Sequence, residues 1–392
     1  MRLFLAMGWA GALCATPAFA DSLVDWNLSP ATMEMGDWTV LLGGTASGAG
    51  YVETQDGGPD RSGVTGSLLL LPRVQRELDN GWTLGAHAGL LAYHDALSGD
   101  SYGNRVLEKA YVSLDTQYGR VEAGEQDGAA YQLSVTGPRI DDLANIDNAN
   151  VTFYRNPATG RAFVNLFPIR TAEFASGNFV KLTYLSPRLF DVQLGASYTP
   201  GEAHGVLPFV SSGENSADRQ ENLLEGAANF MQSFGAITAS AYAGLVLAHD
   251  AARTPGHEGL RDWSVGGELD YDFEPVRLSI GGAWRHSNAY TFAIDESFER
   301  SSTDALRLCA TAALGSWLAS LEYADGRANQ EDSFSGFGET GWEPSVDYIV
   351  NANLQLTLGW QRLVFKRSEG VFADGRTQAA MQAAFLHLLL KV

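Results

Sequence analysis

Alternation of apolar and polar residues with a period of two runs through most of this 392-residue chain. Residues 237–245 carry Ile, Ala and Leu at the odd positions and Thr, Ser, Tyr and Gly at the even ones. The same alternation recurs in segments 82–92, 190–198, 263–271, 276–285, 317–323 and 354–360. Successive side chains of a strand point to opposite sides, so each segment is expected to be a strand with one apolar and one polar face.

The connections between these segments alternate between short and long. The short ones are 79–81, 116–119, 186–188, 233–235, 274–275, 315–316 and 351–353, and their residues suit tight turns. The long ones are 53–61, 95–104, 129–178, 200–220, 250–260, 289–302, 327–344 and 367–376. Short inner turns, long external loops, and aromatics at the ends of apolar faces are typical of outer-membrane barrels.

Seven short and eight long connections predict an all-β chain, a transmembrane barrel of 16 antiparallel strands. We expect strands at 37–52, 62–78, 82–94, 105–115, 120–128, 179–185, 189–199, 221–232, 236–249, 261–273, 276–288, 303–314, 317–326, 343–350, 354–366 and 377–392. Residues 21–36 show no clear alternation and are expected to form a lead-in on the periplasmic side. A soluble sandwich or solenoid is the alternative, but such folds seldom need 16 strands with aromatic-edged apolar faces.

Composition excludes several other classes. The chain has 26 basic and 46 acidic residues, a formal charge of −20, which argues against a nucleic-acid partner. Past residue 20 no apolar run approaches the roughly 18 residues of a membrane helix. Two cysteines, Cys14 and Cys309, cannot build a disulfide framework or a cysteine-rich zinc site.

The first twenty residues have the layout of a secretory signal. Arg2 precedes an apolar run, and the stretch ends in Ala18-Phe19-Ala20, a small-x-small cleavage pattern. We predict cleavage after Ala20, export, and a single barrel domain over 21–392.

One stretch is specific enough to indicate a family. Lys109-Ala110-Tyr111-Val112-Ser113-Leu114, a short turn, and then the run Gly119 to Gly128 (GRVEAGEQDG) resemble the strand pair before the third external loop of Gram-negative general (diffusion) porins, alphaproteobacterial type. The resemblance implies a homotrimer of 16-stranded barrels in outer-membrane lipid, with the third loop, here about 129–178, folded inward to narrow the lumen. In that family the last residue is usually aromatic, whereas this chain ends in Val392.

The residues that line the lumen can be deduced from the alternation, because the polar positions of each strand lie opposite its apolar, lipid-facing positions. The polar faces carry Arg73, His87, Lys109, Arg120, Arg277, Arg285 and Arg307, and a charge facing lipid near the midplane is unfavourable by about 2–4 kcal/mol. The resemblance implies a constriction in which acidic loop residues face a basic wall. We assign the acidic side to Asp141, Asp142 and Asp147, and the basic side to Arg73, Lys109 and Arg120. The alternative is that the loop charges pair locally and the wall cations are merely solvated.

Three further possibilities carry less weight. His87 could be a pH-sensitive gate, although a lone solvated lumen histidine is the simpler interpretation. Loop carboxylates such as Asp95, Asp100, Glu331 and Asp332 could bind calcium, but they lack EF-hand spacing; no other metal or cofactor is expected. An enzyme would need a paired histidine, and neither the spacing of the loop histidines nor any motif provides one.

These observations predict an outer-membrane channel for passive diffusion of small hydrophilic solutes and ions. Its charge selectivity is expected to be weak and set by the acidic loop facing the basic wall. A substrate-selective porin for an anionic nutrient is the first alternative, and a barrel enzyme or adhesin is the second.

Overall fold

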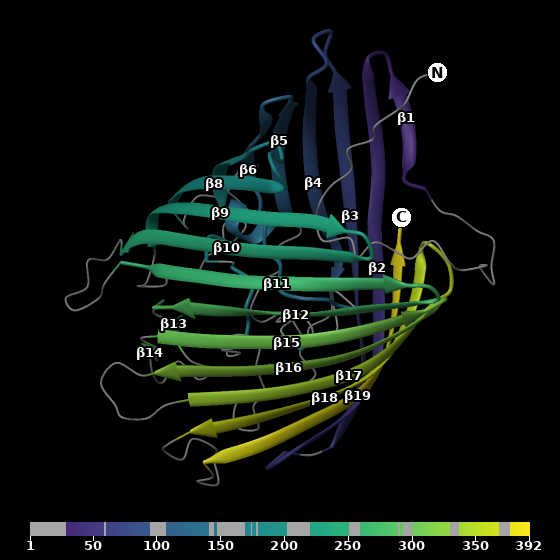
Figure 1. The fold of residues 1–392 in the computed structure, drawn as a ribbon, viewed down its shortest axis with the longest axis vertical. Helices are drawn as coiled ribbons and strands as arrows, with labels where there is room; N and C mark the ends of the chain where they lie inside the picture. Colours follow the sequence, from purple (N-terminus) through teal and green to yellow (C-terminus); the bar gives the residue numbers. More distant parts are fainter. Residues whose placement is uncertain are drawn as a thin grey trace.

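Sixteen strands close into one antiparallel barrel (Figure 1). The computed structural model describes residues 29–58, 60–94, 107–140, 145–146, 169–173, 175–177, 179–201, 220–250, 259–288, 291–292, 299–300, 302–329, 337–367 and 377–392. The barrel strands are β2 (Trp38–Gln55), β3 (Arg61–Glu77), β4 (Thr83–His94), β5 (Leu107–Thr116), β6 (Gly119–Glu125), β7 (Val180–Leu185), β8 (Val192–Gly201), β9 (Gln220–Phe234), β10 (Ile237–Asp250), β11 (Arg261–Phe273), β12 (Val276–Ser287), β15 (Ser302–Leu314), β16 (Trp317–Asn329), β17 (Phe337–Ile349), β18 (Leu354–Arg367) and β19 (Gln378–Lys391). The predicted barrel of 16 antiparallel strands is therefore confirmed.

Closure occurs between the last strand and the first barrel strand. β19 pairs with β2 from Met381↔Gln55 to Lys391↔Thr45. The C-terminal residue adds two hydrogen bonds, because Gly44 N donates to Val392 O at 3.0 Å and Val392 N donates to Gly44 O at 2.9 Å. Closure gives the backbone groups of both strands partners, which a strand surrounded by hydrocarbon requires.

The two faces of the barrel wall differ in polarity. Outward positions carry exposed apolar side chains, for example Leu224, Leu269 and Ile280. The inward positions between them carry buried polar or charged side chains, such as Glu225 on β9 and Asp270 on β11. This arrangement inverts that of a soluble protein and suits a wall with lipid outside and polar groups inside.

The chain before the barrel contains a strand that the sequence did not reveal. β1 (Ala31–Met35) pairs with the start of β2 from Ala31↔Leu42 to Met35↔Trp38, and Gly36 takes a φ of +63° in the turn between them. We expected an irregular lead-in here. Every residue of β1 is exposed, so no buried face imposes a readable alternation on this segment.

The turn before β8 also lies later than predicted. Phe190 and Asp191 have φ values of 51° and 64°, and a bridge joins Leu189 to Val192 around them. Two successive positive φ angles are the geometry of a type I′ hairpin turn. Phe190 is therefore a turn residue, 97% exposed, and not the first apolar residue of a strand.

Strands β16 and β17 run further into the connection than expected. β17 begins at Phe337 and not at 343, although it contains Pro344. The pairing of β17 with β18 passes from Trp342↔Arg362 to Ser345↔Gly359, so this ladder omits the proline, which has no N–H to donate.

Residues 126–179, which join β6 to β7, form what we call the third segment. Its described parts include the one-turn helix α2 (Ala129–Gln132). Elsewhere, β13 (Thr291–Phe292) and β14 (Glu299–Arg300) form a small separate hairpin. Within the described part of the chain, no helix has the length and hydropathy needed to cross a membrane.

Candidate functional site

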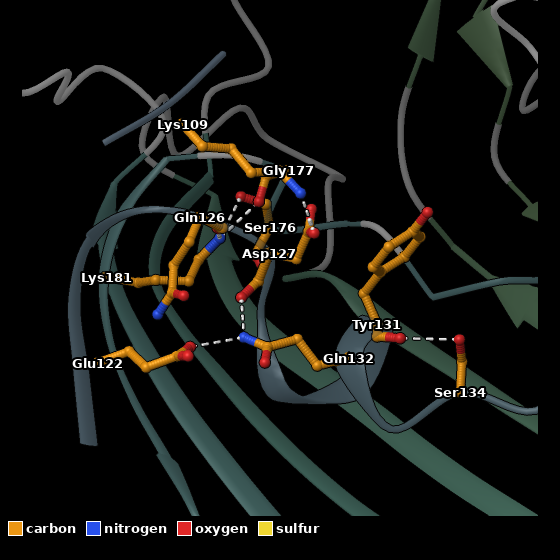
Figure 2. Close-up of polar contacts among 10 residues, drawn as sticks. All are labelled: Lys109, Glu122, Gln126, Asp127, Tyr131, Gln132, Ser134, Ser176, Gly177 and Lys181. Atoms are coloured by element: carbon orange, nitrogen blue, oxygen red, sulfur yellow. Dashed lines mark hydrogen bonds and ion pairs between the residues drawn. The ribbon is translucent and has the colours of Figure 1, made fainter. Parts of the chain in front are cut away.

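The two ends of the third segment meet at one lysine on the barrel wall (Figure 2). The ammonium of Lys181 donates to the carbonyl oxygens of Gln126 at 2.6 Å and Ser176 at 3.2 Å, and also to that of Gly177. We call Gln126, Asp127, Ser176 and Gly177 the neck. Lys181 is 2% exposed, and a lysine has three N–H donors, so three carbonyls satisfy a buried cation.

A second lysine binds the start of the segment. Lys109 on β5 forms an ion pair with Asp127. Gln132 then donates its side-chain amide to Asp127 O and to Glu122 on β6, both at 2.9 Å. Lys109 was assigned to the basic wall from the sequence, but its partner Asp127 was not among the selected acidic residues.

Side chains of the wall bind the free N–H groups at the start of α2. Ala129 N donates to Ser197 Oγ at 2.7 Å, and Ala130 N donates to the Glu225 carboxylate at 3.1 Å. These are amides that a helix leaves without an internal partner. Gly128 precedes them, and a Cβ there would overlap the carboxylate of Glu225. The described start of the segment is therefore seated on the inward side of β8 and β9.

The segment next crosses β11, β12 and β15. Arg307 is fully buried, lies 2.8 Å from the Glu322 carboxylate and donates to Thr136 Oγ1 at 3.3 Å. Gly137 follows with a φ of +93°, and an added Cβ would lie 2.9 Å from the carbonyl carbon of Gly281. Backbone contacts backbone here, which only glycines permit.

Two isoleucines mark the far side of the crossing. The carbonyl of Ile140 accepts from the Gln355 side chain on β18 at 2.7 Å. Ile146 N donates to Glu322 at 3.3 Å, and a Cβ at Gly341 would lie 2.6 Å from the Ile146 side chain. The described residues on both sides of 141–144 thus contact the wall formed by β16, β17 and β18.

A buried carboxylate holds the returning part of the segment. Glu173, 1% exposed, has an oxygen 3.9 Å from Arg285 Nε, and Arg285 forms an ion pair with Asp262. Ala175 N donates to Glu173 at 3.0 Å. Burial, followed by the nearby charge of Asp262, raises the pKa of the Glu173 carboxyl well above its ordinary value, and Arg285 partly offsets this.

Arg73 and His87 occupy paired positions on β3 and β4. The His87 ring stacks on Tyr111 with centroids 4.5 Å apart, and a nitrogen of the ring lies 2.9 Å from Ser113 Oγ. His87 is buried between these partners. It is thus a packed residue of the inner wall, and the lone solvated histidine that we expected is not what the structure shows.

The other predicted basic residues carry carboxylate partners. Arg120 lies 2.8 Å from Glu122 and 3.4 Å from Asp115, and Arg277 lies 3.3 Å from Asp270 and 3.4 Å from Asp272. With Lys109, Arg285 and Arg307, five of the predicted lumen cations form ion pairs. They are not simply solvated.

Sequence reasoning missed most of the acidic side of this wall. Among the residues that the structure describes, the buried acidic ones are Glu53, Glu122, Glu125, Glu173, Glu225, Asp262, Asp270, Glu322, Glu339, Glu343 and Asp347, whereas the buried lysines and arginines are Lys181, Arg285 and Arg307. The alternation of polar and apolar positions that selected the inward arginines would equally have selected the carboxylates of the strands. Glu322, for example, shares its strand face with Ser320 and Ala324.

Asp141, Asp142 and Asp147 lie outside the described residues, as do the loop carboxylates considered for calcium. Among the residues that the structure does describe, no group of three or more His, Cys, Asp or Glu side chains could hold a metal ion.

A sequence model described as Gram-negative porin matches residues 6–368. The chain belongs to the Gram-negative porin family. It is therefore an outer-membrane porin. The match does not separate branches of the family, so the alphaproteobacterial placement stays a prediction. No curated protein matches the sequence of this porin.

Solved structures share the barrel at low sequence identity. OmpF of Salmonella typhi in complex with daunomycin is 11% identical with a TM-score of 0.59, covering 92% of this porin and all of that chain. An anion-selective porin from Comamonas acidovorans is 14% identical with a TM-score of 0.55, covering 91% and 100%. A trimer form of in-vitro folded OmpT of Vibrio cholerae is 12% identical with a TM-score of 0.55, covering 91% and 99%. Likeness at this identity concerns the fold alone.

Proposed function

We propose that this porin is a passive diffusion channel for small hydrophilic solutes and ions, narrowed by the third segment, and that it is not an enzyme. The observation that carries the proposal is the seating of the described parts of that segment on the inward face of the wall. Contacts from Ala129 to Ser197, from Thr136 to Arg307 and from Ile146 to Glu322 support the proposal, because each joins a described residue of the segment to a side chain of the barrel wall. A segment seated on the inner wall would narrow the lumen, and its side chains would line the passage for solutes.

The acidic side of the constriction is proposed to be Asp141, Asp142 and Asp147, and the basic side Arg73, Lys109 and Arg120. Ring order supports this assignment. Ile140 and Ile146 contact β16–β18, whereas β5 and β6, which carry Lys109 and Arg120, stand five to eight strands from these strands in the ring of sixteen. Arg73 on β3 stands three to five strands away, at the side of the same lumen. Acidic residues beside these isoleucines would start from the wall opposite Lys109 and Arg120, and the field between the two walls would orient permeating solutes.

A weak preference for cations is proposed on the same grounds. Carboxylates outnumber lysines and arginines among the buried side chains of the described part of the chain, and the whole chain carries a formal charge of −20. Salt screens the external loop charges over about 8–10 Å, so the residues at the constriction should control the selectivity. The channel is proposed to need no cofactor.

The experiment is the reversal potential of the refolded porin in planar bilayers under a KCl gradient. The test variant changes Asp141, Asp142 and Asp147 to Asn, and the control variant changes Asp95, Asp100 and Asp332 to Asn, an equal change of charge. We expect the test variant to shift toward anions and the control to stay near the parent. Equal shifts of the reversal potential in the two variants would contradict the proposed constriction. A saturable block of the current by phosphate would favour a porin selective for an anionic nutrient instead.

Export and assembly complete the proposal. We propose cleavage after Ala20 and a homotrimer. Gly44, Ala46 and Gly48 alternate with the inward residues Ser47 and Ala49 on β2 and so give the barrel a flat outer stripe, on which a second copy could pack closely. Mass spectrometry of the exported chain and its mass in detergent test these two points.

A further inference from the structure

We propose that Lys181 is the positioning residue of the third segment, and that it directs both ends of the segment into the lumen and keeps the constriction still. The inference rests on the proposed function, because a constriction matters only in a conducting channel. Lys181 was not selected by the sequence, since nothing near it in the chain resembles a binding motif.

The strand ladder does not itself hold the neck. Pairing between β6 and β7 ends at Glu125↔Val180, so the next residue on one side and the preceding residues on the other have no ladder partner. Lys181 bonds the carbonyls of Gln126, Ser176 and Gly177 just beyond that last pair. One side chain therefore holds, at a single point, the place where the chain leaves the wall and the place where it returns.

The hydrogen bonds of the Lys181 ammonium suit a residue that holds the chain in place, and not a site that binds permeating ions. A buried ammonium with its three protons on three carbonyls has no donor left for a passing anion. The neighbouring Asp127 is bound by Lys109, so the outgoing end is held a second time. The returning end has Ser176 and Gly177 on Lys181, with Glu173 bound further back near Arg285. Figure 2 shows the contacts of Lys181 and Lys109 gathered near Tyr131 and Gln132 of α2.

Removing the ammonium should release the returning end first. Lys181→Met keeps an unbranched side chain of similar length but leaves three carbonyls without their donor. Hydrogen bonds to a charged group are strong enough that losing one raises the population of the detached state roughly tenfold or more. The barrel itself should still form, because the ladders of β6 and β7 are unchanged. The matched control is Lys366→Met, the same substitution at an exposed position of β18.

Two measurements test the proposal. Open-channel current fluctuations in planar bilayers should rise about tenfold in Lys181→Met and not in Lys366→Met. Limited trypsin digestion of the folded barrel should cut the third segment at Arg139 or Arg170 in Lys181→Met, while the parent and the control resist. The second measurement does not depend on conductance. If the parent passes no current but only Lys181→Met is cut by trypsin, the proposed function fails and the proposed role of Lys181 is retained.

Chemical rescue separates a role of the ammonium from general damage. In a Cys14→Ala, Cys309→Ala background, Lys181→Cys is alkylated in denaturant with bromoethylamine, which restores an ammonium with sulfur in place of one methylene. After refolding, this protein should regain quiet current and trypsin resistance, whereas the same protein alkylated with iodoacetamide should not. A noisy, trypsin-sensitive aminoethylated protein would overturn the proposal, as would quiet current and resistance in Lys181→Met.

Discussion

Gly137 offers a direct test of whether the third segment is packed against the wall. Its φ is +93°, and an added Cβ would lie 2.8 Å from Gly282 N and 2.9 Å from the carbonyl carbon of Gly281, and would overlap the sulfur of Cys309. The change Gly137→Ala therefore combines an unfavourable backbone conformation with a backbone clash. The wall cannot yield easily, because Gly281 and Gly282 belong to the ladder of β12.

The magnitude follows from the two terms. A left-handed conformation is unfavourable for alanine by about 1–2 kcal/mol. Overpacking against a rigid neighbour adds about 1–3 kcal/mol, so the expected sum is about 2–5 kcal/mol. Gly81→Ala is the matched control, because Gly81 has a φ of +78° but no atom within 4 Å of an added Cβ. It should show the backbone term alone.

The assay has a global and a local readout. Urea unfolding followed by tryptophan fluorescence reports the barrel, and trypsin sensitivity at Arg139 reports the segment. The clash can be relieved by detaching the segment, so we expect Gly137→Ala to become trypsin-sensitive with a smaller change in barrel unfolding. Gly81→Ala should keep its segment protected. If the two variants behave alike, the close contact between Gly137 and β12 is not real.

Three other predictions concern the charged contacts of the segment. Arg307→Met should destabilise the folded porin by about 3–5 kcal/mol in urea unfolding, because it removes the cation that faces the buried carboxylate of Glu322; adding Glu322→Gln should recover part of the loss, and strict additivity would contradict the pairing. Glu225→Ala should weaken the seating of α2 by about 1–3 kcal/mol, seen as faster hydrogen exchange at Ala130, and unchanged exchange would argue against the contact. The pKa of the Glu173 carboxyl is raised in the seated state, so its protonated form stabilises that state at low pH. This stabilisation is lost as the pH rises from about 4.5, the ordinary pKa of a glutamate, through the raised pKa. Current fluctuations should therefore grow with pH over that window, and Glu173→Gln should remove the trend.

Most strand positions could be predicted because each strand carries its own alternation. Strands β11 and β18, for example, differ from the expected ranges by at most one residue at either end. The failures occur where alternation carries no information. β1 is exposed on all sides, and Phe190 continues an apolar pattern although its backbone forms the turn.

The candidate site was less predictable, because it depends on which distant side chains share the interior. Phase alone places Arg285 and Arg307 on the polar face of their strands. It does not show that Arg285 reaches Asp262 and Glu173, or that Arg307 reaches Glu322 and Thr136. The contact between Arg307 and Thr136 joins residues 171 positions apart in the chain.

The sequence by itself therefore determined the barrel, the number of its strands, and which face of each strand is apolar and which is polar, because a two-residue period and a turn are local properties. Tertiary structure alone decided what fills the interior. Gln126 and Lys181 are 55 residues apart, and Ile146 and Glu322 are 176 apart, so no local pattern encodes either contact. They form because ring closure brings separate strands around one lumen, where buried donors and acceptors must find partners.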